Sequence, residues 1–111
     1  MQFDPNEYKD KDDEYYVKPE EIDSYIGKSL KPSEWLTIDQ ERINKFADAT
    51  MDHQFIHVDP EQATPVFGST IAHGFLSLSL VAGIPFEQDI GMVLEGTKMG
   101  LNYGLDKVRF L

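Results

Sequence analysis

The stretch IAHGFLSLSLVAGIP, residues 71–85, constrains the fold more than any other part of the sequence. Its spacing predicts one helix, with Ser69 or Thr70 as the N-cap and Pro85 as the residue that stops it. Since burying one large apolar side chain stabilises a protein by about 1.5–3 kcal/mol, such a helix must be covered on most sides. We therefore predict an α+β fold in which a sheet curls around this central helix. Its large apolar residues are Phe75, Leu76, Leu78, Leu80, Val81 and Ile84.

Length and charge indicate one domain with an acidic leader. The chain has 111 residues and a hydrophobic content of 41%, which suit a single globular domain. Residues 1–24 hold nine acidic residues and three lysines, a net charge of −6 out of −10 for the whole chain. We expect this leader to cover or trail from a domain at residues 25–111. Its charge argues against binding to nucleic acid or to an anionic membrane, and a solvated acidic face is the simpler interpretation.

The chain contains no cysteine, which excludes disulfides, a thiolate nucleophile and a cysteine zinc site. The N-terminal residues lack the basic and apolar regions of a secretory signal. The apolar run at residues 71–86 is shorter than the ~20 residues that a membrane span needs. We therefore expect a soluble, cytoplasmic protein.

Two segments before the central helix show periodic patterns. Residues 34–38, EWLTI, are predicted to be a short strand anchored by Trp35. A helix follows, and its start is set either by Asp39 as N-cap or by a capping box of Thr37 with Gln40. The apolar face of this helix comprises Ile43, Phe46, Ala47 and Thr50.

The remaining segments are shorter or less regular. Residues 59–63, DPEQA, are predicted to be one helical turn, with Asp59 as cap and Pro60 in the first helical position. Residues 64–70, TPVFGST, are predicted to be a loop. Residues 97–111 alternate weakly and are predicted to be a strand that bends at its two glycines.

The segment MDHQFIHVD, residues 51–59, combines two aspartates, two histidines and a glutamine with four apolar residues, of which Phe55, Ile56 and Val58 interrupt the polar ones. It could be a metal site, an acid–base site, or a polar loop that dips into a core. A zinc site would use His53 and His57, which are four residues apart, if the segment were helical. A carboxylate of Asp52 or Asp59 would complete it. The apolar residues and the proline that follows argue against a continuous helix, so we expect an irregular segment.

Three blocks of this sequence, FADATMDHQFIHVD, FGSTIAHGF and NYGLDKVRF, occur in an order that resembles the MaoC-like dehydratases, the (R)-specific enoyl-CoA hydratases of the hot-dog fold. The signature of that family is an aromatic residue, a short spacer, Gly-Asp-x-Asn-Pro-Leu-His, and a small residue six positions later. The resemblance implies an antiparallel sheet wrapped around the long central helix. The residues that fit the signature are Phe46, Asp52, Ile56, His57 and Ala63.

The sequence departs from the family pattern in three ways. Met51 stands where the family usually has glycine, which matters if that backbone needs a positive φ angle. Gln54 and Phe55 replace the usual asparagine and proline. The chain stops where a family member continues with three more strands. We expect those strands to come from a longer protein or from another chain.

The resemblance implies hydration of a trans-2-enoyl thioester to an (R)-3-hydroxyacyl thioester, or the reverse dehydration. It implies that Asp52 and His57 together activate a water molecule. It also implies that the backbone N–H of Gly74, at the start of the central helix, donates to the thioester oxygen. First-turn N–H groups lack an intrahelical partner and lie at the positive end of the helix dipole, which suits this role.

The resemblance further suggests His73, Phe55 and Tyr103 as substrate-binding residues, with His73 holding the helix start or the loop. The substrate would be a thioester of CoA or of acyl carrier protein. No cofactor and no metal ion are implied, and we expect a homodimer. Three basic residues either meet the phosphates of CoA or are ordinary edge residues: Lys98, Lys107 and Arg109.

Two other functions on the same fold stay open. One is a non-catalytic protein that binds acyl thioesters or a partner, and the other is a thioesterase. The presence of Asp52, His57 and Gly74 together argues against a degenerate enzyme. An aspartate followed by a histidine five residues later favours the hydratase over the thioesterase, although fold alone does not decide function.

Overall fold

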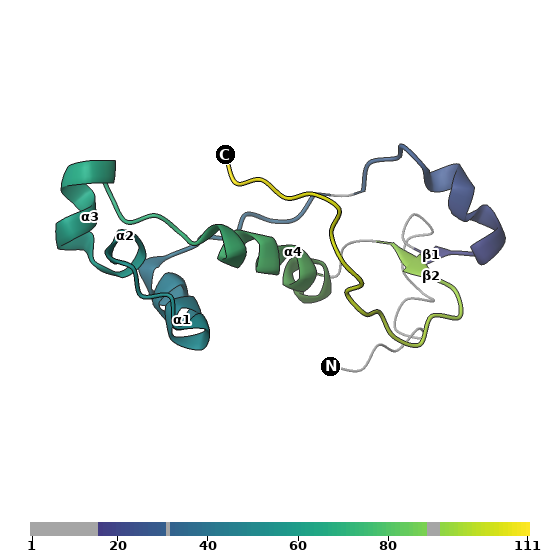
Figure 1. Ribbon diagram of the computed structural model, residues 1–111. Helices are drawn as coiled ribbons and strands as arrows, with labels where there is room; N and C mark the ends of the chain where they lie inside the picture. The colour runs from purple at the N-terminus through teal and green to yellow at the C-terminus, as the bar shows by residue number, and fades with distance from the viewer. Residues whose placement is uncertain (1–15, 31, 89–91) are drawn as a thin grey trace. The chain divides into compact units, whose positions relative to one another are not determined.

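The computed structural model describes residues 16–30, 32–88 and 92–111, which divide into two units (Figure 1). One unit is residues 34–87. The other comprises the described residues before Glu34 and after Glu87. Most of the predicted acidic leader, residues 1–15, lies outside the described residues.

Helix α1 spans Gln40–Thr50 and begins as its N-cap predicts. The backbone N–H of Arg42 donates to Asp39 Oδ1 at 2.9 Å, so Asp39 and not the alternative capping box sets the start. Ile43 and Ala47, from the predicted apolar face, are buried. The prediction of this helix is therefore confirmed at its start and for Ile43 and Ala47, whereas Phe46 is half-buried and Thr50 is exposed.

Helices α2, Phe55–Val58, and α3, Pro60–Phe67, follow at once (Figure 1). Asp59 ends α2 and also caps α3, because its carboxylate accepts the N–H groups of the first turn. The prediction of an irregular segment is therefore wrong for its second half, and the loop predicted at residues 64–70 is wrong up to Phe67. The proline inside α3 removes only one hydrogen bond of a short helix. The last turn is closed by the N–H of Gly68, which donates to the Thr64 carbonyl at 2.8 Å.

Helix α4 spans Gly74–Glu87, and both of its predicted ends are wrong. Ser69 and Thr70 lie before the helix, and the Thr70 hydroxyl is bonded to a residue of α1 instead of capping. The carbonyl of His73 accepts from the N–H groups of Leu76 and Ser77, at 3.1 and 3.3 Å. Pro85 lies inside the helix, which ends two residues later at Glu87. Because proline has no N–H, it removes one hydrogen bond, and this loss falls in the final turn of the helix.

The apolar character of α4 is only partly satisfied in the described structure. Leu76 is buried, whereas Phe75 and Val81 are 67% and 68% exposed. Residues 34–87 contain helices and irregular segments but no strand. The sheet wrapped around this helix therefore stays a prediction.

The other unit contains a small sheet. Strand β1, Tyr16–Val17, pairs in parallel with β2, Val93–Leu94, and a short 3₁₀ helix, η2, spans Pro19–Tyr25. Val17 is fully buried. The described part of the chain is thus α+β, as predicted, although the pairing seen there is parallel.

Two predicted strands are wrong in this structure. Residues 34–38 and 97–111 are irregular, and Trp35, the predicted anchor, is fully exposed. A strand requires a neighbour for its backbone hydrogen bonds, and neither segment belongs to a sheet within the described residues. Among those residues, no helix is long and apolar enough to cross a membrane.

Met51, directly after α1, has a φ of 66° and a side chain that is 84% exposed. Met51→Gly is expected to raise the free energy of unfolding by about 0.5–1 kcal/mol. A residue with a Cβ pays roughly 1–2 kcal/mol in this conformation, and the greater freedom of unfolded glycine offsets part of the gain. Urea unfolding measures the change. Met51→Ala keeps the Cβ and is the control, and a Met51→Gly protein no more stable than this control would contradict the prediction.

Candidate active site

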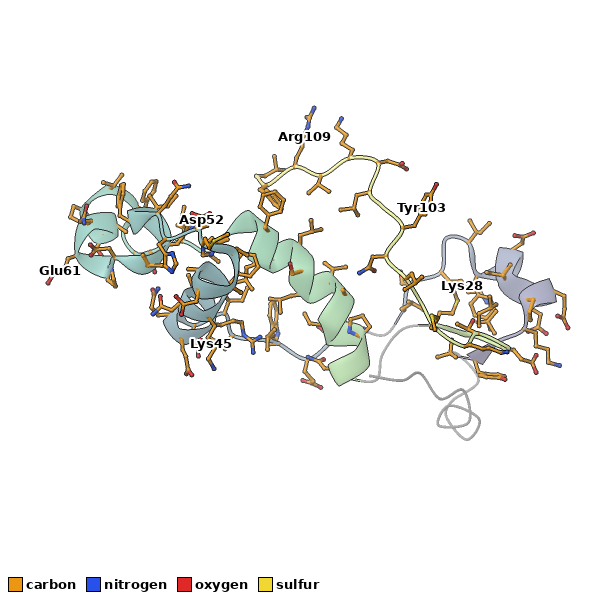
Figure 2. The ribbon with its side chains drawn as sticks, turned by 60° about the horizontal axis from the view of Figure 1, so that its bottom comes forward. Lys28, Lys45, Asp52, Glu61, Tyr103 and Arg109 are labelled. Carbon is orange, nitrogen blue, oxygen red and sulfur yellow. The ribbon has the colours of Figure 1, made fainter. Side chains whose placement is uncertain are left out.

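Asp52, His57 and His73 converge within the unit of residues 34–87. Met51 turns the chain after α1 and so places Asp52 beside α2, which carries His57. His73 lies just before α4. One side-chain nitrogen or oxygen from each of the three lies within 4.8 Å of the others. Figure 2 shows Asp52 where these helices meet.

The hydrogen bonds of His57 define which of its ring nitrogens can act as a base. The side chain is buried, and Nδ1 lies 2.7 Å from the carbonyl oxygen of Ile71. A carbonyl oxygen only accepts hydrogen bonds, so in the neutral ring Nδ1 carries the proton. Nε2 then has a free lone pair, and it lies 3.9 Å from Asp52 Oδ2.

The distance between Nε2 and the carboxylate has a chemical meaning. It is longer than the donor–acceptor distance of a direct hydrogen bond, and both atoms are acceptors when the imidazole is neutral. Asp52 is 39% exposed at its side chain, so solvent reaches the carboxylate. The pair is therefore spaced to accept two hydrogen bonds from one shared water molecule.

His73 supports this pair from the other side. Its side chain is 3% exposed, and its Nε2 lies 3.0 Å from the backbone oxygen of Asp52, to which it donates. The rings of His57 and His73 are stacked with centroids 3.8 Å apart, and Phe46 meets His73 edge-on at 4.9 Å. His73 thus joins the start of α4 to the loop that carries Asp52.

The rings of His57 and His73 are not arranged as joint ligands of one metal ion. The lone pair of a ligating imidazole nitrogen lies in the plane of its ring. The rings of His57 and His73 are tilted by only 23° and stacked, so their two lone pairs cannot meet at one ion without rearrangement. His53, from the zinc set considered above, instead lies 2.9 Å from Asp48 on the exposed surface. Asp59, its other candidate, caps α3.

The remaining predicted site residues fall in different places. Gly74 is the half-buried first residue of α4, where a backbone N–H has no intrahelical partner. Phe55 is the first residue of α2 and is partly exposed. Tyr103 belongs to the other unit, where its side chain is fully exposed (Figure 2). Its role in substrate binding stays a prediction.

Gln40 is a residue of the site that the sequence reasoning missed. Its Nε2 donates to the backbone oxygen of His57 at 2.8 Å, and its Oε1 accepts from the Thr70 hydroxyl at 2.6 Å. The feature of the sequence that could have indicated Gln40 is its position on the helix. Gln40 shares a helix face with Ile43 and Ala47, so it is a polar side chain where an apolar one is expected.

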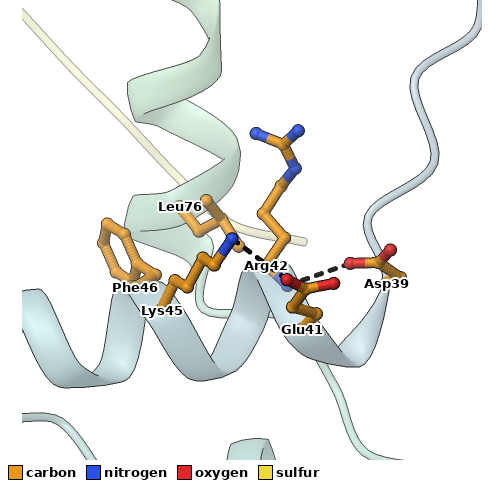
Figure 3. Close-up of a pocket in the computed structure, with 6 residues that line it drawn as sticks. All are labelled: Asp39, Glu41, Arg42, Lys45, Phe46 and Leu76. Carbon is orange, nitrogen blue, oxygen red and sulfur yellow. Dashed lines mark hydrogen bonds and ion pairs between the residues drawn. The ribbon is translucent and has the colours of Figure 1, made fainter.

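A hollow of about 380 Å³ opens beside α1 (Figure 3). The charges that line it are balanced, and Lys45 Nζ lies 3.1 Å from Glu41 Oε1, one turn away on α1. Phe46 lines the hollow and also contacts His73, so it borders both features. The lining residues are Asp39, Glu41, Arg42, Lys45, Phe46 and Leu76.

Comparison with known proteins agrees with the resemblance predicted from the motifs. The sequence matches the MaoC-like domain over residues 21–111. Nodulation protein N of Rhizobium leguminosarum bv. viciae is 56% identical over 93 residues, which cover 82% of this chain and 56% of that protein. The 3-hydroxyacyl-thioester dehydratase Z of Mycobacterium tuberculosis is 53% identical over 85 residues, which cover 76% and 54%. The chain spans about half the length of these curated relatives.

Zinc binding tests the ring geometry directly. Because the stacked histidines cannot share an ion, titration of the protein with Zn²⁺ is expected to give no stoichiometric binding by calorimetry at micromolar concentrations. His57→Ala is the control, and its titration should match that of the unaltered protein. One zinc bound per chain, lost in His57→Ala, would contradict this expectation.

Proposed function

Because the chain belongs to the MaoC-like domain family, we propose that it hydrates trans-2-enoyl thioesters to (R)-3-hydroxyacyl thioesters, or catalyses the reverse dehydration. The observation that carries the proposal is the placement of His57 Nε2, with its free lone pair, 3.9 Å from the Asp52 carboxylate. The name of the mycobacterial relative, a 3-hydroxyacyl-thioester dehydratase, supports the same reaction class.

In the proposed hydration, a single water molecule donates one of its hydrogens to His57 Nε2 and its second hydrogen to Asp52 Oδ2. The water oxygen bonds to C3 of the enoyl group while Nε2 takes a proton, and the π electrons of the double bond move toward the thioester oxygen. That proton is then delivered to C2, so that water is added across the double bond with no net change in the protein. Acid–base catalysis of this kind typically contributes ~10²–10⁴ in rate.

The backbone N–H of Gly74 is proposed to donate to the thioester oxygen as negative charge develops there. It lies at the positive end of α4, directly after His73, so the helix dipole adds to the hydrogen bond. The absence of a side chain at Gly74 lets the thioester carbonyl approach. The carrier arm is proposed to be that of CoA or of acyl carrier protein.

We also propose that in the whole protein α4 is the central helix of a hot-dog fold, wrapped by an antiparallel sheet, and that two copies form a homodimer. The exposed apolar side chains of α4 support this, since such side chains are normally covered.

The direct test is a spectrophotometric assay of the protein in the full length in which it is naturally produced. A short trans-2-enoyl-CoA is added, and loss of the conjugated thioester absorbance is followed. Asp52→Asn and His57→Ala are each expected to reduce kcat by ~10² or more, because each removes one partner of the water. The matched controls are Asp48→Asn and His53→Ala, which alter the exposed aspartate–histidine pair and should change kcat less than twofold.

Either of two results would contradict the proposal. Release of free CoA, detected with a thiol reagent, without formation of the 3-hydroxyacyl product would indicate a thioesterase. Equal losses in the Asp52 variant and the Asp48 control would remove the proposed pair from the chemistry.

A second prediction concerns Gly74. Proline is tolerated in the first position of a helix, where it removes one N–H group that has no intrahelical partner. Gly74→Pro is therefore expected to lower kcat by ~10²–10³, the usual effect of losing an oxyanion donor. Gly74→Ala keeps the N–H and should lose much less activity. The reverse order of the two variants in the same assay would show that steric access and not the donor matters here.

A further inference from the structure

The amide of Gln40 joins three segments around His57. It lies at the start of α1, and all its polar hydrogens and its oxygen are used. One hydrogen of Nε2 goes to the His57 backbone oxygen at 2.8 Å and the other to Asn44 Oδ1 at 2.9 Å. Oε1 accepts from the Thr70 hydroxyl at 2.6 Å.

The orientation of this amide is fixed by chemistry. If it were turned over, Oε1 would face the His57 carbonyl oxygen, and two acceptors would be in contact. A hydroxyl at Thr70 accepts or donates, so it does not decide between the two orientations. The carbonyl of His57 does, and it requires the amide nitrogen of Gln40 on its side.

Two of these bonds act on the same imidazole. One holds the backbone of His57 itself. The other holds Thr70, the neighbour of Ile71. The carbonyl oxygen of Ile71 lies 2.7 Å from His57 Nδ1 and accepts its proton in a hydrogen bond. One side chain of α1 therefore braces both the residue that carries the ring and the segment that orients it, beside the backbone bond from the N–H of Ile71 to the Ile56 carbonyl at 2.9 Å.

We propose that Gln40 is a positioning residue for His57. It keeps the Nδ1–H bond to Ile71 closed, and so keeps the lone pair of Nε2 directed at Asp52. Without it, the bond from the Ile71 N–H to Ile56 has no side-chain brace beside it. The Nδ1–H bond is then weakened, and the ring can rotate or place its proton on Nε2, which has no lone pair left for a water. The effect on rate rests on the proposed hydratase function, whereas the effect on the tautomer does not.

The experiment compares matched variants. Gln40→Met keeps the length of the side chain and removes its hydrogen bonds. Gln62→Met is the control, because Gln62 also bonds through Nε2, to Asp59 Oδ2 at 2.6 Å, and its described hydrogen bonds do not involve His57. Thr70→Val removes the hydroxyl at constant shape, and Thr70→Ser restores a hydroxyl to the same position.

The first readout is the ¹⁵N NMR spectrum of the histidine side chains, which distinguishes Nδ1–H from Nε2–H tautomers. The unaltered protein, Gln62→Met and Thr70→Ser are expected to show His57 with its proton on Nδ1. Gln40→Met and Thr70→Val are expected to show a broadened signal or a mixture of tautomers. A His57 signal in both of these variants that equals that of Gln62→Met would overturn the proposal, whatever the activity.

The second readout is the hydratase assay. Gln40→Met is expected to lower kcat about 10- to 100-fold with KM changed less than twofold, because a misplaced base slows the chemistry without removing a substrate contact. A rise in KM at constant kcat would also overturn the positioning role. If the unaltered protein is inactive but its His57 tautomer depends on Gln40, the proposed function fails while the positioning role holds.

Discussion

The hydrogen bond between His57 Nδ1 and the Ile71 carbonyl is the interaction on which the rest of the site depends. A buried imidazole has two nitrogens and, when neutral, one proton, so whatever holds one nitrogen determines the chemistry of the other. Here His57 Nδ1 is bonded to a backbone carbonyl oxygen, which only accepts hydrogen bonds, whereas a side-chain hydroxyl can accept or donate. The segment carrying that oxygen is itself tied to α2, since the N–H of Ile71 donates to the Ile56 carbonyl at 2.9 Å.

Around this bond the packing is apolar on one side and polar on the other. Phe46 and the stacked ring of His73 form the inner wall, which limits the tilt of the His57 ring. Gln40 and Thr70 form the polar side, through their hydrogen bond to each other and the bond from Gln40 to the His57 backbone. A buried polar group without a partner is costly, so a site of this kind is stable when nearly every donor and acceptor is used. Among the described side chains that are not exposed, His73 Nδ1 is the one fully buried polar atom without a hydrogen bond.

Sequence reasoning succeeded where structure is decided locally. Asp39 and Asp59 cap helices through bonds to residues two or three positions ahead, and the inner face of α1 follows from its periodicity. It failed for the start of α4, because the Thr70 hydroxyl that could cap the helix is bonded to α1 instead. The resemblance named Asp52, His57 and Gly74. It could not supply the tautomer of His57, the bond from His73 to the Asp52 backbone, or the part of Gln40, since each depends on contacts between segments.

The hydrogen bonds that hold the site join residues 14 to 30 positions apart in sequence. Doubling the length of such a loop adds only about 0.6 kcal/mol to the cost of closing it, so the four bonds differ little in this cost. The geometry around His57 is therefore encoded almost entirely within residues 40–74. A sequence change outside residues 40–74 that leaves this unit folded would therefore leave the hydrogen bonds of the site in place.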